Sequence, residues 1–503
     1  MTLIVLFLAA LLVLVLVGAP LFVILGAATA LGFVVFVPEY RSFHDLTVIV
    51  LTIEELLGKH EFLAISLFVA SGAIMTAGGI ASRLVAIFRA ALGWLPGGMA
   101  VAAVMTCMYF ASISGSSPVT LIAVGSIMFP ALCDSKYPEN FSLGLITTAG
   151  SLGCLVPPSI SMLIYAISIS GSPASVSPQD MFLAGLIPAF FVGGLLIVYS
   201  VLVGLRQGER EAFDARRFGR ALRDGAWALP LPVVVLAGIK EGLFTPSEAG
   251  AVATGYALVV TMAIYRELSF KKLLESLIES ATLMGSLILI IVLSFGLNDL
   301  LTLTDVQAKL IALIEWMHLG PFGFMLLVNV VLIVLGALMD SISATLIFAP
   351  LLAPLAWQVY GIDPIHFGVV FVVNMEIGYL MPPVATNLFV ASALFKKPFG
   401  QVTRAVVPTL AITCIALFVI MYVPTLSKAA VNWNQGKPGY EAFPWDGKPK
   451  APETPPAAVE VEAGVTAPPK PEGTTDLSGI TSKGMADWED DDEAKAPAPD
   501  AGP

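Results

Sequence analysis

Long apolar runs, separated by short polar interruptions, fill most of this chain. The runs Leu3–Val17, Leu21–Val37 and Leu326–Leu338 contain no Lys, Arg, Asp or Glu. Because a helix needs about 20 mostly apolar residues to cross a bilayer, residues 1–425 predict roughly ten to twelve membrane-spanning segments. No basic region precedes the first run, so we expect a retained helix and not a cleaved signal peptide.

The composition supports a membrane protein. Hydrophobic residues make up 57% of the 503 residues and charged residues only 13%, which is too apolar for a soluble globular protein. The four cysteines and four histidines are scattered, without a C-x-x-C pair, so we expect no disulfide, no metal cluster and no organic cofactor. Of the net charge of −11, residues 431–503 contribute −8 (fourteen acidic and six basic side chains), which leaves −3 for the remainder. This balance does not indicate nucleic-acid binding.

Two polar segments stand apart from the apolar body. Residues 426–503 become rich in Pro, Ala and acidic residues from about Val431, and we predict a disordered tail there, with a docking element as the alternative. The stretch LRQGEREAFDARRFGRALRDG at 205–225 carries six arginines. The positive-inside rule places this stretch in the cytoplasm, and we interpret it as a linker loop between two halves of the membrane body.

The two halves repeat one another at an offset of 225 residues. SSPVTLIAVGSIMFPAL at 116–132 resembles SISATLIFAPLLAPLA at 341–356. The same offset places the pair Pro157–Pro158 on Pro382–Pro383. Basic residues follow the second proline pair but not the first, so equivalent loops are expected on opposite sides of the membrane. Continuing through the last span places the acidic tail on the periplasmic side.

We therefore predict an all-α polytopic membrane protein of two inverted repeats, residues 1–204 and 226–425. Each repeat is expected to contain a re-entrant helical hairpin and a broken transmembrane helix. The hairpins are predicted at about 98–134 and 327–357, and the broken helices at about 141–169 and 367–394. Paired discontinuous helices are typical of secondary transporters, whose substrate and ion sites lie near the bilayer midplane.

Polar residues interrupt each predicted hairpin at its tip. The tip segments are ASISGSSPVT at 111–120 and ALMDSISAT at 337–345. Polar backbone at this depth is tolerated where it is buried in protein or lines a cavity. The hydroxyl groups of the first tip, which suit an alkali ion or a carboxylate, belong to Ser114, Ser116, Ser117 and Thr120. The alternative is that these hydroxyls allow close helix packing or bond to their own backbone.

Each double proline predicts a helix break that stays open. Pro157 and Pro158 cannot donate backbone hydrogen bonds, and Gly153 and Gly378 allow close backbone approach at the two breaks. The freed carbonyl groups can coordinate Na⁺. The exposed N–H groups at a helix N-terminus favour an anion.

Two acidic residues lie within apolar segments. Asp340 is at the second hairpin tip, and Glu376 precedes the second proline pair. Intramembrane carboxylates are costly and are functional candidates by default; these two could bind a cation, relay a proton or pair with another group to fix the fold. Direct contact with an anionic substrate is disfavoured by repulsion. Asn374 and Asn387 flank the second break and could donate amide hydrogen bonds or cap the helix locally.

At these positions the chain resembles the large membrane subunit of tripartite ATP-independent periplasmic (TRAP) transporters, the DctM-like family. The matching motifs are SGSS before Thr120, PPSI at 157–160, GALMD, EIGYLMPP and NLFV at 387–390. Ala385 stands where glycine is common in the family. The resemblance covers roughly residues 1–425.

The resemblance implies a function and partners. It implies a sodium-driven importer of an organic acid, of the C4-dicarboxylate or 2-oxo acid class, that works by an elevator motion in the bacterial inner membrane and is not an enzyme. A periplasmic substrate-binding protein (DctP-like) would deliver the substrate, and a small four-helix membrane subunit (DctQ-like) would brace the large one. Sodium would be the only metal ion.

The resemblance also implies two sodium and substrate sites, one in each half. The first site would comprise Ser114, Gly115, Ser116, Ser117, Thr120, Gly153, Val156, Pro157, Pro158 and Ser159. The second would comprise Met339, Asp340, Ser341, Ser343, Thr345, Gly378, Met381, Pro382, Pro383 and Asn387, supported from behind by Asn374 and Glu376.

Other functions remain open at this stage. A stand-alone sodium/anion symporter of the same superfamily would need no binding protein. An intramembrane serine protease would pair Ser114 or Ser116 with His366. A passive channel would not accumulate substrate. An ATP-driven pump is disfavoured because the chain has no G-x-x-x-x-G-K-[ST] loop.

Overall fold

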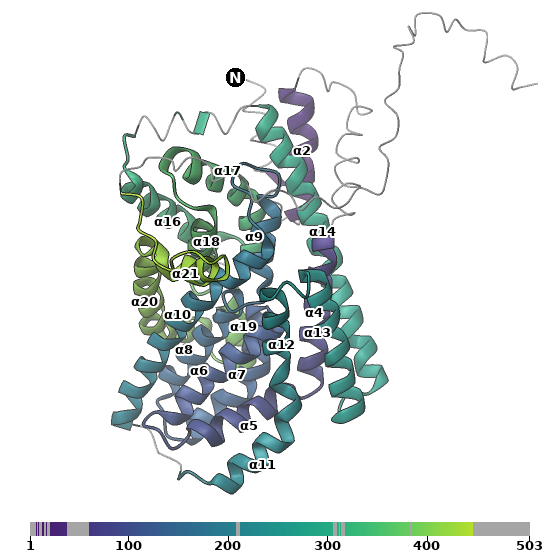
Figure 1. Cartoon of the computed structure of the whole chain (residues 1–503), viewed down its shortest axis with the longest axis vertical. Coiled ribbons are helices and arrows are strands. Elements are labelled where there is room, and N and C mark those ends of the chain that lie inside the picture. Colours follow the sequence, from purple (N-terminus) through teal and green to yellow (C-terminus); the bar gives the residue numbers. More distant parts are fainter. Residues whose placement is uncertain are drawn as a thin grey trace, which may run out of the picture. The chain divides into compact units, whose positions relative to one another are not determined.

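The computed structural model describes residues 21–37, 60–207, 212–304, 317–382 and 385–445, together with a few single positions near the N-terminus and around 310. All regular elements among these residues are helical (Figure 1). Seven described helices are long and apolar enough to cross a membrane, or nine if each bent pair is one span. Apolar length alone predicted more, because several apolar helices are shorter than a full span.

The helices of the two repeats correspond one to one. The first repeat contains α6 (Gly98–Ser114), α7 (Ser117–Asp134), α8 (Glu139–Ser151) and α9 (Ile160–Ser168). The second contains α16 (Pro321–Leu338), α17 (Ser341–Tyr360), α18 (Pro364–Gly378) and α19 (Thr386–Phe395). In each repeat the first two helices form the hairpin and the last two form the broken helix. The second hairpin begins at 321 instead of about 327.

The backbone conformation also repeats at the offset of 225. Lys136 and Gly361, which follow the two hairpins, both adopt left-handed conformations, with φ of 63° and 65°. Gly171 and Lys396, which follow the two broken helices, do the same, with φ of 82° and 52°. Non-glycine residues rarely adopt positive φ. The two repeats therefore share their turns as well as their helices.

The repeats are inverted with respect to each other. Figure 1 places α6 and α7 toward one end of the helical body, beside α5 (Ile80–Leu92). It places α16 and α17 toward the opposite end. The two hairpins thus enter the helical body from opposite ends, as the distribution of basic residues predicts.

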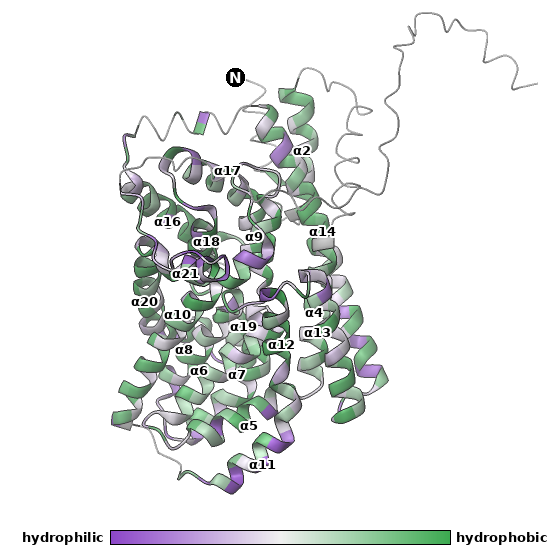
Figure 2. Ribbon diagram, viewed as in Figure 1, coloured by the Kyte–Doolittle hydropathy of each residue, from purple (hydrophilic) through white to green (hydrophobic). Residues whose placement is uncertain are grey.

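The remaining helices surround the two sets of hairpin and broken helix. They are α2 (Leu21–Phe36), α4 (His60–Ala77), α10 (Pro178–Gln207), α11 (Ala215–Gly225), α12 (Pro230–Lys240), α13 (Pro246–Leu258), α14 (Phe270–Leu303), α20 (Phe399–Tyr422) and α21 (Pro424–Asn434). Helix α4 packs against α13 and α14, and α14 also packs against α2. Figure 2 shows that apolar residues dominate most of these helices, whereas α11 is largely hydrophilic.

Helices α4 and α5 meet at a bend of 70°. The guanidinium of Arg83, on α5, donates two hydrogen bonds to the Glu267 carboxylate, at 2.6 and 2.9 Å, and lies 3.7 Å from the centroid of the Tyr265 ring. The hydrogen bond from Arg83 lowers the pKa of the Glu267 carboxyl below its usual value. Gly79 at the bend has φ of 72°, and a Cβ there would lie 2.0 Å from Glu267. The hydrogen bonds between Arg83 and Glu267 fix the bend to the segment before α14.

Part of the predicted linker loop is a helix. Residues 215–225 form α11, and the side chain of Asp214 caps it by accepting a hydrogen bond from Arg216 N at 2.8 Å. The half-buried Phe218 and Ala221 and the buried Gly225 lie on one side of α11, which packs against α5. The prediction of a loop was wrong because it weighed the arginines and overlooked this helical spacing. Residues 208–211 lie outside the described part.

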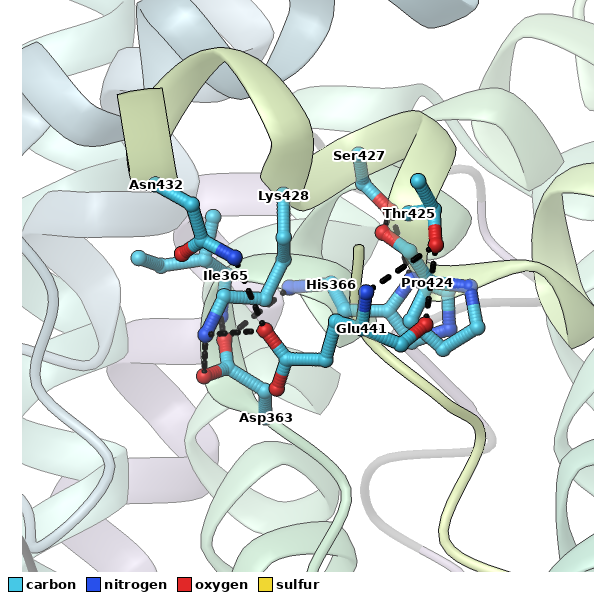
Figure 3. A network of polar contacts seen from close by, with 9 residues as sticks. All are labelled: Asp363, Ile365, His366, Pro424, Thr425, Ser427, Lys428, Asn432 and Glu441. Atoms are coloured by element: carbon cyan, nitrogen blue, oxygen red, sulfur yellow. Dashed lines mark hydrogen bonds and ion pairs between the residues drawn. The ribbon is translucent and has the colours of Figure 1, made fainter. Parts of the chain in front are cut away.

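The tail begins later than predicted. Residues 424–434 form α21, in which Ser427, Ala429 and Val431 are buried. Lys428 forms ion pairs with Asp363 and, at 3.2 Å, with Glu441 (Figure 3). The prediction of disorder from 426 was wrong for residues 426–445, because these ion pairs join positions far apart in the sequence. Residues 446–503 lie outside the described part.

Candidate transport site

The tip of the first hairpin contacts the break of the first broken helix. Gly115, between α6 and α7, is left-handed with φ of 60°, and its carbonyl accepts a hydrogen bond from Ile160 N at 3.3 Å. A Cβ at Gly153 would lie 2.6 Å from the Ser116 carbonyl oxygen, and one at Gly115 would lie 2.8 Å from that of Pro158. Glycine is required at both positions because the two backbones touch.

The hydroxyl groups of this tip form a small network. The hydroxyls of Ser114 and Thr120 are 2.8 Å apart, and Thr120 Oγ1 donates to the Ser116 carbonyl at 2.8 Å. Asn387 Nδ2, from α19 of the second repeat, donates to Ser117 Oγ at 2.6 Å. Asn387 Oδ1 is buried and has no hydrogen-bond partner among the described residues. The tip thus presents hydroxyl, carbonyl and amide oxygens, the hard donors that alkali and alkaline-earth cations prefer.

The first break is buried, and the hydroxyl of Ser159 bonds to residues of the same segment. Val156, Pro157 and Pro158 are buried, and a cis peptide bond joins the two prolines. Ser159 caps α9: its hydroxyl accepts from Met162 N at 3.4 Å and donates to the Cys154 carbonyl. Ser159 therefore stabilises the start of α9.

The second tip has one bond in common with the first. Thr345 Oγ1 donates to the Ser341 carbonyl at 2.6 Å, which is the counterpart of the bond from Thr120 to Ser116. The Ser341 hydroxyl lies 2.6 Å from the hydroxyl of Tyr379 at the second break. The second tip and the second break are therefore also in contact.

Asp340 stabilises the start of α17. Its two carboxylate oxygens accept hydrogen bonds from Ser343 N, at 3.0 Å, and Ser343 Oγ, at 2.5 Å. Met339 ends α16, with its N–H bonded to the Leu335 carbonyl at 2.9 Å. The sequence left three roles open for Asp340: cation binding, proton relay and pairing that fixes the fold. These hydrogen bonds favour the third role.

The second break also packs closely against its hairpin. A Cβ at Gly378 would lie 2.6 Å from Gly336 of α16. Met381 N bonds to the Gly378 carbonyl at 3.1 Å, and Pro382 is exposed. Ala385, where the family commonly has glycine, is left-handed with φ of 36°. Pro383 lies outside the described residues.

Asn374 and Glu376 are fully buried on α18. Asn374 Nδ2 donates to the Val370 carbonyl at 2.9 Å, and Glu376 accepts a hydrogen bond of 3.0 Å from Ser151. Both side chains retain one oxygen without a hydrogen-bond partner among the described residues. Their supporting role at the second site stays a prediction.

A cavity of about 460 Å³ opens beside the first tip. This volume is within the range of small-molecule sites, about 300–1,000 Å³. Ser114, Gly115, Ser116 and Ser117 line it, and the second repeat contributes Ile342 and Tyr379. The other predicted site residues that the structure describes do not line it.

Sequence reasoning missed several residues of this cavity. The polar ones are Thr76, Ser161, Ser276, Glu279, Ser280 and Tyr379. Three of them, Ser276, Glu279 and Ser280, lie on one face of α14. Their spacing of three and four residues within an apolar stretch was the available signal.

The proposed protease pairing is not formed. The ring of His366 contacts the Ser427 hydroxyl at 2.6 Å and the Met421 carbonyl at 3.1 Å (Figure 3). Ser114 and Ser116 are at the hairpin tip and have no histidine among their hydrogen-bond partners.

Two inverted repeats with broken helices that meet beside a cavity, lined largely by apolar residues with hydroxyl groups at the hairpin tip, define a membrane transport protein. The family model described as "Tripartite ATP-independent periplasmic transporter, DctM component" matches residues 8–426, and the chain belongs to this family. It is 38% identical over 411 residues, 81% of this chain and 94% of the other, to the C4-dicarboxylate TRAP transporter large permease protein DctM of Pseudomonas aeruginosa.

Two further similarities extend this comparison. The isethionate TRAP transporter permease protein DctMQ of Oleidesulfovibrio alaskensis is 35% identical over 367 residues, 72% of this chain and 57% of that protein. The crystal structure of the Alcanivorax borkumensis YdaH transporter matches with a TM-score of 0.53 at 14% identity, covering 84% of this chain and 98% of that one. The last comparison shows a shared fold.

Proposed function

We propose that this chain is the permease subunit of a sodium-driven transporter that imports an organic acid into a bacterial cell. The observation that carries the proposal is the cavity at the first hairpin tip, which both repeats line and which has the size of a small-molecule site. Hydroxyl groups and two helix N-termini, those of α7 and α9, adjoin it. Helix N-termini favour anions, which supports a carboxylate or sulfonate as cargo.

Sodium is the proposed coupling ion. The oxygens of Ser114, Ser116 and Asn387 gather at the first tip, within the network described above. The second ion would lie between Ser341 and the break at Gly378, where the same helix arrangement recurs. Inward movement of the hairpins and broken helices as one body is the proposed elevator motion.

A binding protein and a small membrane subunit are the proposed partners. The family name describes a tripartite system, and the name DctMQ of one relative combines M and Q. A C4-dicarboxylate or a 2-oxo acid is the proposed substrate class, supported by the C4-dicarboxylate relative. The inner membrane, with the C-terminal tail in the periplasm, is the proposed location.

Reconstitution in proteoliposomes tests this function. The chain, its small subunit and the binding protein are assayed for uptake of organic acids with and without an inward sodium gradient. We expect accumulation that requires both the gradient and the binding protein. Equal uptake without the binding protein would favour a stand-alone symporter, and uptake that never exceeds the external concentration would favour a channel.

Variants of the tip connect this activity to the site. Ser116→Ala and Pro157→Ala are expected to raise the sodium concentration for half-maximal uptake without reducing membrane insertion. Ser126→Ala is the matched control, because Ser126 is on α7 beyond the tip and, within the described part of the chain, its hydroxyl bonds to the Ala123 carbonyl alone. Wild-type sodium dependence in both tip variants would contradict the proposed ion site.

A further inference from the structure

Glu279 brings a carboxylate to the wall of the cavity from α14. The residues of α14 that line the cavity are Ser276, Glu279, Ser280, Leu283 and Leu287. Their spacing of three, four, seven and eleven residues from Ser276 places them on one face of the helix. Glu275, one turn earlier, is not on this wall and lies 4.0 Å from Lys271.

The carboxylate of Glu279 has no partner of its own. Among the residues that the structure describes, none forms a hydrogen bond or ion pair with it, and no Lys, Arg or His lines the cavity. An acidic side chain within a membrane-spanning helix is costly and commonly faces a cavity on a substrate or ion path. The Glu279 side chain is exposed, so its carboxylate is accessible to a group that enters the cavity.

The chemistry of the remaining wall restricts that group. Hydroxyls of Ser114, Ser116, Ser161 and Tyr379 and the helix N-termini can hold an acidic group at the tip. A carboxylate on the α14 wall would repel a second negative charge brought close to it. It would accept a hydrogen bond from a hydroxyl or an ammonium group.

We propose that Glu279 is a specificity-determining residue, which selects acids that carry a hydroxyl or ammonium group in addition to their acidic group. This inference rests on the proposed function as an organic-acid importer and narrows its substrate class to hydroxy or amino acids, hydroxylated C4-dicarboxylates included, over 2-oxo acids. Glu279 recognises the donor on the carbon skeleton, and the first hairpin tip recognises the anion. Acids without a donor leave the Glu279 carboxylate unpaired when they fill the cavity.

Uptake of matched acids tests this selection in the reconstituted complex. The pairs are succinate and malate, propionate and lactate, and ethanesulfonate and isethionate, which differ by one hydroxyl. For each pair the ratio of uptake, hydroxyl-bearing over hydroxyl-free, is measured for the wild type, Glu279→Met and the control Glu275→Met. Ratios within one preparation do not depend on the amount of folded protein, and the same binding protein is used throughout.

We expect Glu279→Met to lower this ratio about tenfold, which corresponds to about 1.4 kcal/mol, and Glu275→Met to leave it unchanged. An unchanged ratio in Glu279→Met overturns the inference while the proposed function stands. If Glu279→Met shifts the sodium dependence of uptake equally for both members of a pair, Glu279 acts on the ion, and the inference is also overturned. Absence of sodium-driven uptake for all six acids overturns the proposed function, and the inference with it.

Discussion

Ser151 donates a hydrogen bond of 3.0 Å to Glu376, and the two residues are equivalent positions of the two repeats, 225 residues apart. Equivalent residues can touch only near the axis that relates the repeats. This bond therefore marks where the two halves meet, directly behind both helix breaks. Both residues are fully buried, so the bond forms away from water.

Loss of this bond is expected to destabilise the protein. Ser151→Ala leaves the Glu376 carboxylate without its partner, and the expected loss in the free energy of unfolding is about 1–3 kcal/mol. Thermal unfolding in detergent measures it. Ser142→Ala is the control, because the buried Ser142 hydroxyl, also on α8, bonds to the Pro138 carbonyl of its own first turn and to the Cys133 thiol, and among the described residues it has no bond to the other repeat.

A double-mutant cycle with Glu376→Met separates this bond from other effects, because methionine removes both carboxylate oxygens. If the two side chains interact across the axis, the cycle gives a coupling energy of about 0.5–3 kcal/mol. Additive effects of Ser151→Ala and Glu376→Met would show that the contact contributes nothing to the association of the halves.

Gly153→Ala tests the contact between tip and break. The added Cβ would lie 2.6 Å from the Ser116 carbonyl oxygen and 2.8 Å from Ser117 N, so the tip must move away. Because a functional site tolerates displacements of only about 0.5 Å, we expect sodium-driven uptake to fall at least tenfold. Gly194→Ala on α10 is the control, since nothing lies within 4 Å of a Cβ there. Equal uptake by the two variants would disprove a close contact.

Lys428 is expected to hold α21 in place. Its side chain is only 13% exposed and pairs with two carboxylates, those of Asp363 and Glu441. Lys428→Met removes the positive charge that lies between these two carboxylates and is expected to lower the stability by about 1–3 kcal/mol. Lys240→Met, whose side chain is 54% exposed and pairs with Glu241, should change little. A melting temperature for Lys428→Met as high as that of the control would show that α21 is held by its apolar residues alone.

The sequence predicted the repeat because the signals were local. A Ser-Gly-Ser-Ser interruption in an apolar run and two double prolines at one offset locate the tips and breaks directly. The hairpin tip at Gly115 and the break before Ile160 lie where these signals indicate. Turn residues and prolines act on their own backbone, so neighbouring positions suffice to recognise them.

Contacts between distant segments were beyond this kind of reasoning. The face of α14 that carries Glu279 belongs to the cavity only because α14 packs beside α4 and α17. Helix α21 is held by Asp363, more than sixty residues earlier. Each of these depends on three-dimensional packing.

The opposite orientation of the two repeats is tested most directly by labelling two equivalent positions from one side of the membrane. Ser175 and Gly400 are 225 residues apart, and both are exposed after the broken helix of their repeat. Single cysteines are placed there in a chain whose four native cysteines are replaced by alanine, and intact cells with a permeable outer membrane are treated with a membrane-impermeant maleimide. We predict labelling of Ser175→Cys from the periplasm and of Gly400→Cys only after the inner membrane is opened. Labelling of both from the same side would contradict inverted repeats.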